Sequence, residues 1–281
     1  MSTSVDVVPA RDGYPLAASV FGDGPGAVVV NSATAVPRHY YRAYAEALAA
    51  EGYTVITYDY RGIGDSRRGP LRGFAATVAD WALLDMAGVV DHVAETFAPR
   101  SLFLVCHSVG GQIAGLLDNA GLVDGMVTVS SQSGYWRYQG RGQRLPVAVH
   151  TRLTLPVLAR TLGYVPWSRF SSAEDLPRGV ALQWSRWCRD PRYVLSDPTL
   201  PLERYADFRA PVLAYSVDDD AWGTPRSVDA MMSAYPSVER RHLRPRDHGL
   251  ERLGHFGFFR RESRAVWGET FAWLARRSGR G

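Results

Sequence analysis

Short, largely apolar runs alternate with amphipathic stretches along most of the chain. Between the runs, apolar residues recur at helical spacing, most clearly over residues 75–96. Strands that alternate with helices of this length predict a parallel sheet wound with right-handed crossovers. The runs are typical of strands buried on both faces of such a sheet. They cover residues 27–30, 54–58, 101–105, 125–129 and 211–217.

The two ends of the chain complete this pattern. Turn residues Asp12 and Gly13, between two β-type runs, predict an N-terminal hairpin. Further helices are predicted from about Pro37, where proline suits a first turn, and over residues 228–235. A short strand near residues 240–243 and a final helix close the chain.

The alternation stops between residues 134 and 208. This stretch contains no clear strand, many prolines and a high density of aromatic residues. We therefore expect one α/β core domain, formed by residues 1–133 and 209–281. Residues 134–208 are expected to form a cap inserted into that domain.

A serine follows directly after one of the predicted strands. Residues 105–111 read V-C-H-S-V-G-G, and a predicted helix comes next. This is the context of a nucleophile elbow, a sharp turn that lifts the serine hydroxyl above the sheet edge and toward a helix N-terminus. Its usual pattern is G-x-S-x-G, and Cys106 stands here in place of the first glycine. Ser108 is the candidate nucleophile, and His107, which points the other way in an extended segment, is interpreted as a packing residue.

Carboxylates and histidines follow Ser108 in the order acid, then base, that goes with a nucleophile elbow. Three consecutive aspartates, residues 218–220, come directly after a predicted strand. They are expected at the carboxyl edge of the sheet, where open α/β sheets form their sites. His255 lies in a loop just before the final helix and is the candidate base, with His248 as the alternative.

Three sequence motifs are similar to those of a known protein family. They are Y-D-Y-R-G-I-G-x-S at residues 58–66, H-S-V-G-G-Q at residues 107–112 and G-H-F-G-F-F-R at residues 254–260. Over nearly its whole length the chain resembles the α/β-hydrolase superfamily, and more narrowly a bacterial group of predicted serine hydrolases with these strings. The resemblance implies an α/β-hydrolase fold, in which helices flank a mostly parallel central sheet and a helical cap is inserted. It also implies a Ser–His–Asp triad.

The resemblance places the triad acid within the run of aspartates. The family's G-x-x-D motif falls on Asp219, with Ser216 in place of the glycine. Because of that substitution the register stays open, and Asp218 and Asp220 are the alternatives.

Two backbone N–H groups are expected to form an oxyanion hole. One belongs to Val109, directly after the candidate nucleophile. The other comes from the loop after the early buried strand, where the family commonly has His-Gly and this chain has Asn31-Ser32. That alignment assigns Ala33, with Thr34 as the alternative.

The composition excludes several other chemistries. The 32 basic residues are all arginine, and the absence of lysine rules out a Ser–Lys dyad, a Schiff-base lysine and a P-loop lysine. The arginines are spread along the chain rather than gathered on one element, so no nucleic-acid partner is expected. No clustered His/Cys pattern indicates a metal, and no cofactor is expected.

Other features favour a cytoplasmic protein with no membrane partner. Cys106 and Cys188 form no C-x-x-C pair and are interpreted as buried thiols. The N-terminus lacks the features of a signal peptide. The most membrane-like stretch, residues 145–165, is interrupted by charged groups such as Arg152 and Arg160, which are costly in a bilayer.

We therefore expect a serine hydrolase that cleaves a carboxylic ester, amide or thioester of a small apolar or aromatic substrate. Candidate substrate-binding residues in the cap are Trp136, Trp184 and Trp187. Acyl transfer or C–C bond hydrolysis would use the same triad, and a non-catalytic ligand-binding protein is the alternative from another class. The sequence indicates neither the substrate nor the oligomeric state.

Overall fold

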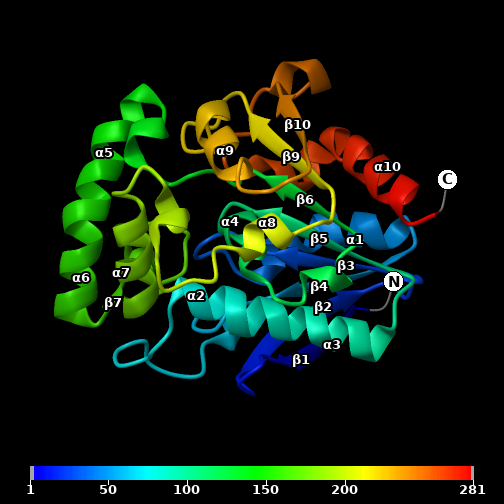
Figure 1. Cartoon of the computed structure of the whole chain (residues 1–281), viewed down its shortest axis with the longest axis horizontal. Coiled ribbons are helices and arrows are strands. Elements are labelled where there is room, and N and C mark those ends of the chain that lie inside the picture. Colours follow the sequence, from blue (N-terminus) through cyan, green and yellow to red (C-terminus); the bar gives the residue numbers. More distant parts are fainter. Residues whose placement is uncertain (1–2, 280–281) are drawn as a thin grey trace.

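The computed structural model describes residues 3–279, and a single eight-stranded sheet forms its centre. The strand order is β1-β2-β4-β3-β5-β6-β9-β10 (Figure 1). Strands β1, β2 and β4 pair antiparallel in that order, and the six from β4 to β10 run parallel. The predicted, mostly parallel sheet is confirmed. Its strands are β1 (Thr3–Pro9), β2 (Pro15–Phe21), β3 (Gly26–Asn31), β4 (Tyr53–Tyr58), β5 (Ser101–His107), β6 (Gly125–Val129), β9 (Val212–Val217) and β10 (Val238–Leu243).

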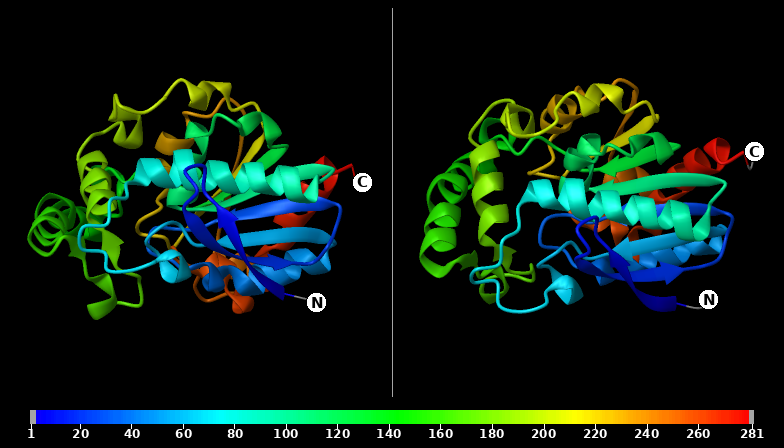
Figure 2. Two further views of the ribbon diagram at one scale, coloured as in Figure 1. Left: turned by 90° about the horizontal axis from the view of Figure 1, so that it is seen from below. Right: turned by 60° about the horizontal axis from the view of Figure 1, so that its bottom comes forward.

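Helices cover both faces of the sheet (Figure 2). One face packs against α1 and α10, and the other against α3, α4 and α9. Alternate residues of β3 point to opposite faces of the sheet. Val28 and Val30 pack on the face covered by α1 and α10, and Val29 packs on the other face. This two-sided burial is the reason for the continuous apolar runs in the sequence. The helices are α1 (Arg42–Ala50), α2 (Val78–Asp80), α3 (Ala87–Phe97), α4 (Val109–Ile113), α8 (Arg204–Asp207), α9 (Pro225–Met232) and α10 (Gly268–Arg277).

The helix predicted over residues 75–96 contains an irregularity. A π-helical turn, Trp81–Met86, lies between α2 and α3. It carries Asp85, whose side chain is fully buried. A buried carboxylate requires a partner, and Arg61 supplies it from the loop after β4.

Arg61 joins three separate segments of the core domain. Its Nε donates to Asp85 Oδ1 at 2.6 Å, and its backbone N–H donates to Asp85 Oδ2 at 2.9 Å. Its two Nη atoms donate to Asp12, at the tip of the β1–β2 hairpin, at 2.7 and 2.8 Å. The guanidinium also lies over the ring of Tyr14, 5.1 Å from its centroid.

A second buried pair lies nearby. Asp59 accepts from Arg38 Nη1 at 2.5 Å and from the Arg38 backbone N–H at 2.6 Å. Asp59 and Arg61 both belong to the string Y-D-Y-R-G-I-G-x-S. The structure thus gives two charged residues of that string a role in joining segments of the core.

The sheet changes its direction of winding at β3. From β3 the chain passes to β4 on one side and later returns to β5 on the other side. Asn31, the last residue of β3, is the parallel partner of Cys106 in β5. The loops that follow these two strands are therefore neighbours at the carboxyl edge, at the switch point where open sheets form ligand crevices.

Most of the segment between β6 and β9, residues 134–208, lies beyond that edge, and the segment contributes no strand to the central sheet. Its last helix, α8, packs instead against the core, where the Tyr205 hydroxyl donates to the Gln112 carbonyl oxygen. A continuous helical stretch, residues 144–162, forms the outer side of the segment and packs against α7 through α6. None of the described helices is long and apolar enough to cross a bilayer. The elements of this segment are α5 (Arg144–Val149), a π-helical turn (His150–Thr154), α6 (Leu155–Leu162), β7 (Tyr164–Val165), β8 (Leu176–Pro177) and α7 (Arg178–Trp187).

Replacing Arg61 with leucine leaves the carboxylate of Asp85 buried without its cation. We expect Arg61→Leu to lower the free energy of unfolding by about 3–5 kcal/mol. Arg42→Leu is the control, because Arg42 is exposed and pairs with Glu46 one helical turn away, so its loss costs less than about 1 kcal/mol. Urea denaturation of both variants measures the difference, and equal stabilities would contradict a structural role for Arg61.

Candidate active site

Ser108 lies at a strained turn between β5 and α4. Its backbone has φ 50° and ψ −112°, a left-handed conformation that is unusual for a residue with a side chain. The Ser108 N–H donates to Val129 O at 3.0 Å and thereby pins the turn to β6. The turn lifts the hydroxyl out of the sheet, as the nucleophile-elbow pattern predicts.

The small residues after Ser108 are required by close packing. A Cβ at Gly110 would lie 2.7 Å from the Asn31 carbonyl oxygen, and one at Gly111 would lie 2.4 Å from Ser131 Oγ. Cys106 takes the place of the usual first glycine, is fully buried and accepts from Asn31 Nδ2 at 3.4 Å. Burial raises the pKa of its thiol to about 12, so Cys106 is no rival nucleophile.

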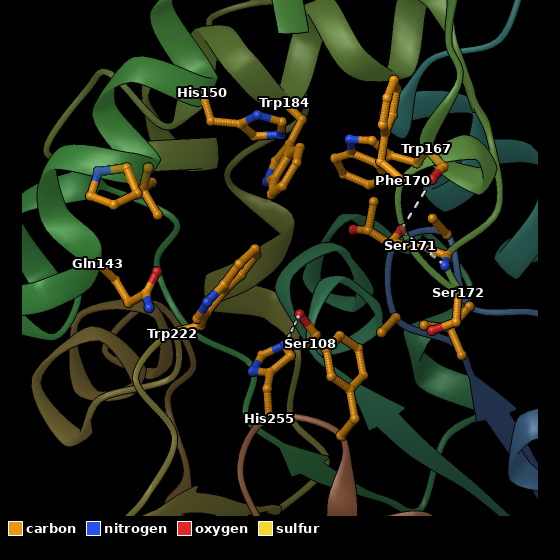
Figure 3. A pocket seen from close by; sticks show the side chains of 18 of the residues that line it. Ser108, Gln143, His150, Trp167, Phe170, Ser171, Ser172, Trp184, Trp222 and His255 are labelled. Carbon is orange, nitrogen blue, oxygen red and sulfur yellow. Dashed lines mark hydrogen bonds between the residues drawn. The ribbon is translucent and has the colours of Figure 1, made fainter. Parts of the chain in front are cut away.

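His255 connects Ser108 to a carboxylate. Its Nε2 lies 3.1 Å from Ser108 Oγ, and its Nδ1 lies 2.8 Å from Asp220 Oδ2. Figure 3 shows the imidazole and the serine hydroxyl facing each other at the base of a cavity. Serine, imidazole and carboxylate thus form one hydrogen-bonded line, the arrangement of a catalytic triad.

The carboxylate in this line belongs to Asp220, which corrects the prediction of Asp219. The backbone remains paired with β10 through Asp218, whose N–H donates to Leu243 O, and it turns only after that residue. The turn closes with a hydrogen bond from the Asp220 N–H to Val217 O at 3.1 Å. The inward-facing carboxylate therefore comes one residue later than the G-x-x-D spacing implies.

The other two aspartates have different partners. Asp219 accepts from the backbone N–H groups of Leu253 and Gly254 at 3.0 and 2.8 Å, so it holds the loop that carries His255. Asp218 is largely exposed and lies 3.2 Å from the imidazole of His242. His248, the alternative base, lies exposed on a surface turn.

Asp220 is held in its charged form. Burial alone would raise the pKa of this carboxyl, but the charge of His255 and its hydrogen bond oppose that effect. The N–H groups of Trp222 and Gly223 also donate to Oδ1, at 2.8 and 2.7 Å. The result is a pKa of about 2, so the carboxylate is available to orient His255 at any ordinary pH.

His107, on the far side of the elbow, holds the backbone of His255. Its Nε2 lies 2.9 Å from the His255 carbonyl oxygen, and its Nδ1 lies 2.9 Å from the hydroxyl of Tyr41. A carbonyl can only accept, so Nε2 carries the proton and Nδ1 accepts from Tyr41. The Tyr41 oxygen in turn accepts from the Ala33 N–H at 2.8 Å.

This buried chain links the loop after β3 to the loop of His255, and it requires a neutral His107. A proton on Nδ1 would turn that nitrogen into a donor facing the Tyr41 O–H, which could then no longer donate to it. Burial first, and then the nearby His255, lower the pKa of His107 to about 3. His107 was expected only to pack behind the elbow, and the hydrogen bonds add a positioning role to that packing.

The prediction of Ala33 as an oxyanion donor is corrected by the same chain, because its N–H is already bonded to Tyr41. Thr34, the next residue, lines the cavity beside Ser108. No hydrogen bond found among the described residues uses the Thr34 N–H. The Val109 N–H lies in the first turn of α4, where a helix offers its N–H groups no internal acceptor.

Ser108 opens into a large cavity between the core and residues 134–208. Its volume is about 1250 Å³, and its lining is mostly apolar. His150 stacks on Trp167, and Trp184 meets Trp167 edge-on, so an aromatic cluster faces Ser108 and His255 across the cavity (Figure 3). The aromatic rings of its lining, other than histidine, are Tyr40, Trp167, Phe170, Trp184, Trp222 and Phe256.

The three tryptophans predicted to bind substrate lie in different places. Trp184 lines the cavity, whereas Trp136 and Trp187 do not. Trp187 is fully buried and donates to Asp197 at 2.8 Å. The ring of Trp136 is in contact with the guanidinium groups of Arg137 and Arg152 and is not part of the cavity lining. Trp222 and Phe256 were missed, although their nearness to the predicted acid and base in sequence was a usable signal.

No group of His, Cys, Asp and Glu side chains in residues 3–279 is arranged to hold a metal ion. The groups that the site places together are the hydroxyl of Ser108, the imidazole of His255 and the carboxylate of Asp220.

Comparisons with known proteins agree with this architecture. Residues 27–267 match the model of the alpha/beta hydrolase family. A comparison with curated proteins found no match.

Many solved structures are similar to this chain, and three illustrate the likeness. A thermophilic esterase from Thermogutta terrifontis, with malate bound, is 19% identical, with a TM-score of 0.62 over 99% of this chain and 100% of that one. A soluble variant of monoglyceride lipase from Saccharomyces cerevisiae, in complex with a substrate analogue, is 15% identical, with a TM-score of 0.67 over 99% and 97%. An esterase from Exiguobacterium antarcticum is 18% identical, with a TM-score of 0.62 over 98% and 100%. These likenesses confirm the predicted α/β-hydrolase fold.

Neighbouring aspartates provide a matched test of the site. We expect Asp220→Asn to slow the labelling of Ser108 by a fluorophosphonate by two or more orders of magnitude, because the amide no longer holds His255 in the reactive tautomer. Asp219→Asn keeps one of its two backbone hydrogen bonds and stays within about tenfold of the wild-type rate. Mass spectrometry of the labelled protein over time measures both rates. Slower labelling of Asp219→Asn than of Asp220→Asn would contradict the assignment of Asp220 and favour Asp219 as the triad acid.

The neutral His107 predicts a pH dependence of stability. In the unfolded chain this residue takes up a proton near pH 6.5, whereas in the folded protein it does so only near pH 3. Between these values unfolding takes up a proton, so the free energy of unfolding falls as the pH falls, by up to about 1.4 kcal/mol per pH unit from this group.

Urea denaturation between pH 4 and 7 measures that slope. His107→Gln should show a shallower decline than the wild type, and His248→Gln, at an exposed histidine, should match the wild type. Identical slopes for all three proteins would exclude the buried neutral imidazole.

Proposed function

Because this chain belongs to the alpha/beta hydrolase family, we propose that it is a serine hydrolase that cleaves carboxylic esters with a large apolar acyl group. The observation that carries the proposal is the line of Ser108, His255 and Asp220, with contacts of 3.1 and 2.8 Å, at the base of an apolar cavity. All three members are present and aligned, which argues against a protein that only binds a ligand.

The reaction begins when Ser108 Oγ attacks the ester carbonyl carbon. His255 Nε2 takes the hydroxyl proton as the bond forms, and Asp220 stabilises the resulting imidazolium through Nδ1. The carbonyl oxygen becomes an oxyanion. When the tetrahedral intermediate collapses, the C–O bond to the alcohol breaks and His255 returns the proton to the leaving alcohol.

Two backbone N–H groups serve as the oxyanion donors in this proposal, those of Val109 and Thr34. Thr34 replaces Ala33 because the Ala33 N–H is bonded to Tyr41. In comparable sites the loss of one donor costs about 3–4 kcal/mol of transition-state stabilisation. The hydrogen-bonded chain through Tyr41 and His107 positions this loop relative to His255 without touching substrate.

The second half of the reaction regenerates the serine. A water molecule attacks the acyl carbon while His255 takes one of its protons. The bond between the acyl carbon and Ser108 Oγ then breaks, and the proton passes from His255 back to the serine. The products are a carboxylic acid and the free enzyme.

The size and lining of the cavity support the substrate class. About 1250 Å³ exceeds the range of roughly 300–1000 Å³ that is usual for small-molecule pockets. An acyl group larger than the small one expected from the sequence therefore fits. The aromatic cluster of Trp167 and Trp184 supplies an apolar wall, and the described lining contains no carboxylate side chain that would favour a cationic group.

Hydrolysis of a series of p-nitrophenyl esters of increasing acyl length tests the proposal. We expect release of p-nitrophenol with an optimum at medium or long chains, and a loss of about 10⁶-fold in Ser108→Ala, as in comparable triads. Ser171→Ala is the control, because this serine also lines the cavity but lies away from His255.

Two results would contradict the proposal. Activity that survives in a folded Ser108→Ala variant would exclude this serine as the nucleophile. A strong preference for short, charged acyl groups would instead refute the substrate class and leave the triad intact.

A further inference from the structure

A line of exposed apolar side chains runs along the outer side of the helical stretch 144–162. Positions 147–148, 151, 155 and 159 face the protein, and Thr151, Leu155 and Ala159 are buried there. Positions two residues away lie on the opposite side of a helix. The exposed members, spaced by four, are Leu145, Val149, Leu153 and Val157, with 71%, 47%, 60% and 46% of their surface exposed. We call these four residues the apolar stripe.

The π-helical turn keeps the stripe straight. In a regular α-helix, residues four apart drift around the axis because a turn takes 3.6 residues. The turn His150–Thr154 holds more residues per turn and offsets that drift at the middle of the stripe. The four side chains therefore stay on one face.

The helices that carry the stripe contain basic residues and no acidic ones. No Asp or Glu occurs from residue 125 to residue 173, whereas this stretch contains six arginines. None of the six forms a salt bridge with a carboxylate in the described part of the chain. Arg137 and Arg152 instead lie over the ring of Trp136, at 4.9 and 5.0 Å from its centroid. The remaining four are Arg141, Arg144, Arg160 and Arg169.

This face lies at the outer edge of the molecule and beside the mouth of the cavity. Helices α5 and α6 form the side farthest from the central sheet (Figure 1). Leu145 and Val149 belong both to the stripe and to the lining of the cavity. Phe170, which is 79% exposed, is a further exposed apolar side chain in the lining of the cavity.

We propose that the apolar stripe and its arginines dock this protein on an anionic lipid surface. A helix with an apolar face and flanking arginines lies in the plane of a membrane interface, with its apolar side chains among the acyl chains and its cations at the phosphates. In this orientation the cavity mouth faces the lipid. The docking does not depend on the proposed ester hydrolysis, and lipid binding can be measured without catalysis.

Charge favours lipid over a second copy of the chain as the occupant. A twofold-symmetric contact places the same patch on both partners. Two stripes packed together would bring together two segments that each carry arginines and no carboxylate from residue 125 to residue 173, which is repulsive. The earlier expectation of no membrane partner rested on the arginines that interrupt residues 145–165, and these same arginines support a position on the surface of a bilayer rather than across it.

Co-sedimentation with vesicles tests the proposal. The protein of residues 1–281 is mixed with vesicles of phosphatidylcholine alone, or of phosphatidylcholine with phosphatidylglycerol, at low and high salt. We expect binding to the anionic vesicles that weakens as salt screens the charges. Leu153→Glu should lower the partition coefficient by about tenfold or more, and Arg160→Glu should lower it by a similar factor.

Two variants on the core domain are matched controls. Leu122→Glu changes a leucine that is 45% exposed, and Arg100→Glu changes an exposed arginine that forms no salt bridge in the described part of the chain. Both should bind vesicles like the wild type. Circular dichroism verifies that all four variants are folded.

Three results would overturn the proposal. One is a protein that stays in solution with every vesicle. Another is equal binding by Leu153→Glu and Leu122→Glu. The third is a concentration-dependent dimer in light scattering that Leu153→Glu abolishes without any vesicle binding, since the occupant of the face would then be a second copy.

Discussion

Parallel pairing between β3 and β5 places Asn31 opposite Cys106, so the chain leaves both strands at the same edge of the sheet. The loop after β3 and the strained turn at Ser108 are neighbours for this reason. The hydrogen-bonded chain from Ala33 through Tyr41 and His107 then extends the arrangement to the loop of His255. The Tyr41 hydroxyl accepts from the Ala33 N–H and donates to His107 Nδ1, and a proton on that nitrogen would break the chain. The site therefore depends on a buried network that touches no reacting atom.

The run of three aspartates illustrates how the same side chain takes different roles from its backbone position. Asp218 is still paired with β10 and faces solvent, Asp219 binds the backbone of the His255 loop, and Asp220 faces the imidazole. Asp219 and His107 hold this loop from two sides. The imidazole consequently has little freedom to leave the line between Ser108 and Asp220.

Most of the fold could be predicted from the sequence, because strands buried on both faces leave continuous apolar runs and Ser108 has an unusual local pattern. His255 followed from its order after the nucleophile. The identity of the acid could not be predicted in this way. In a run of three aspartates, the sequence does not reveal at which residue the turn after the strand begins. The prediction of Ala33 as an oxyanion donor was wrong because its N–H is bonded to Tyr41, which belongs to a different element. No local sequence pattern indicates such a hydrogen bond. Trp222 was missed although it stands only two residues after Asp220 in the sequence.

In the proposed mechanism, Ser108 carries the acyl group between the two halves of the reaction. Rapid acid quenching of the protein during the hydrolysis of a slowly turned-over ester, followed by peptide mass spectrometry, tests it most directly. We expect one acyl group per chain, attached to the peptide that contains Ser108, and none in Ser108→Ala. Turnover without an acylated Ser108, or an acyl group on another residue, would contradict it.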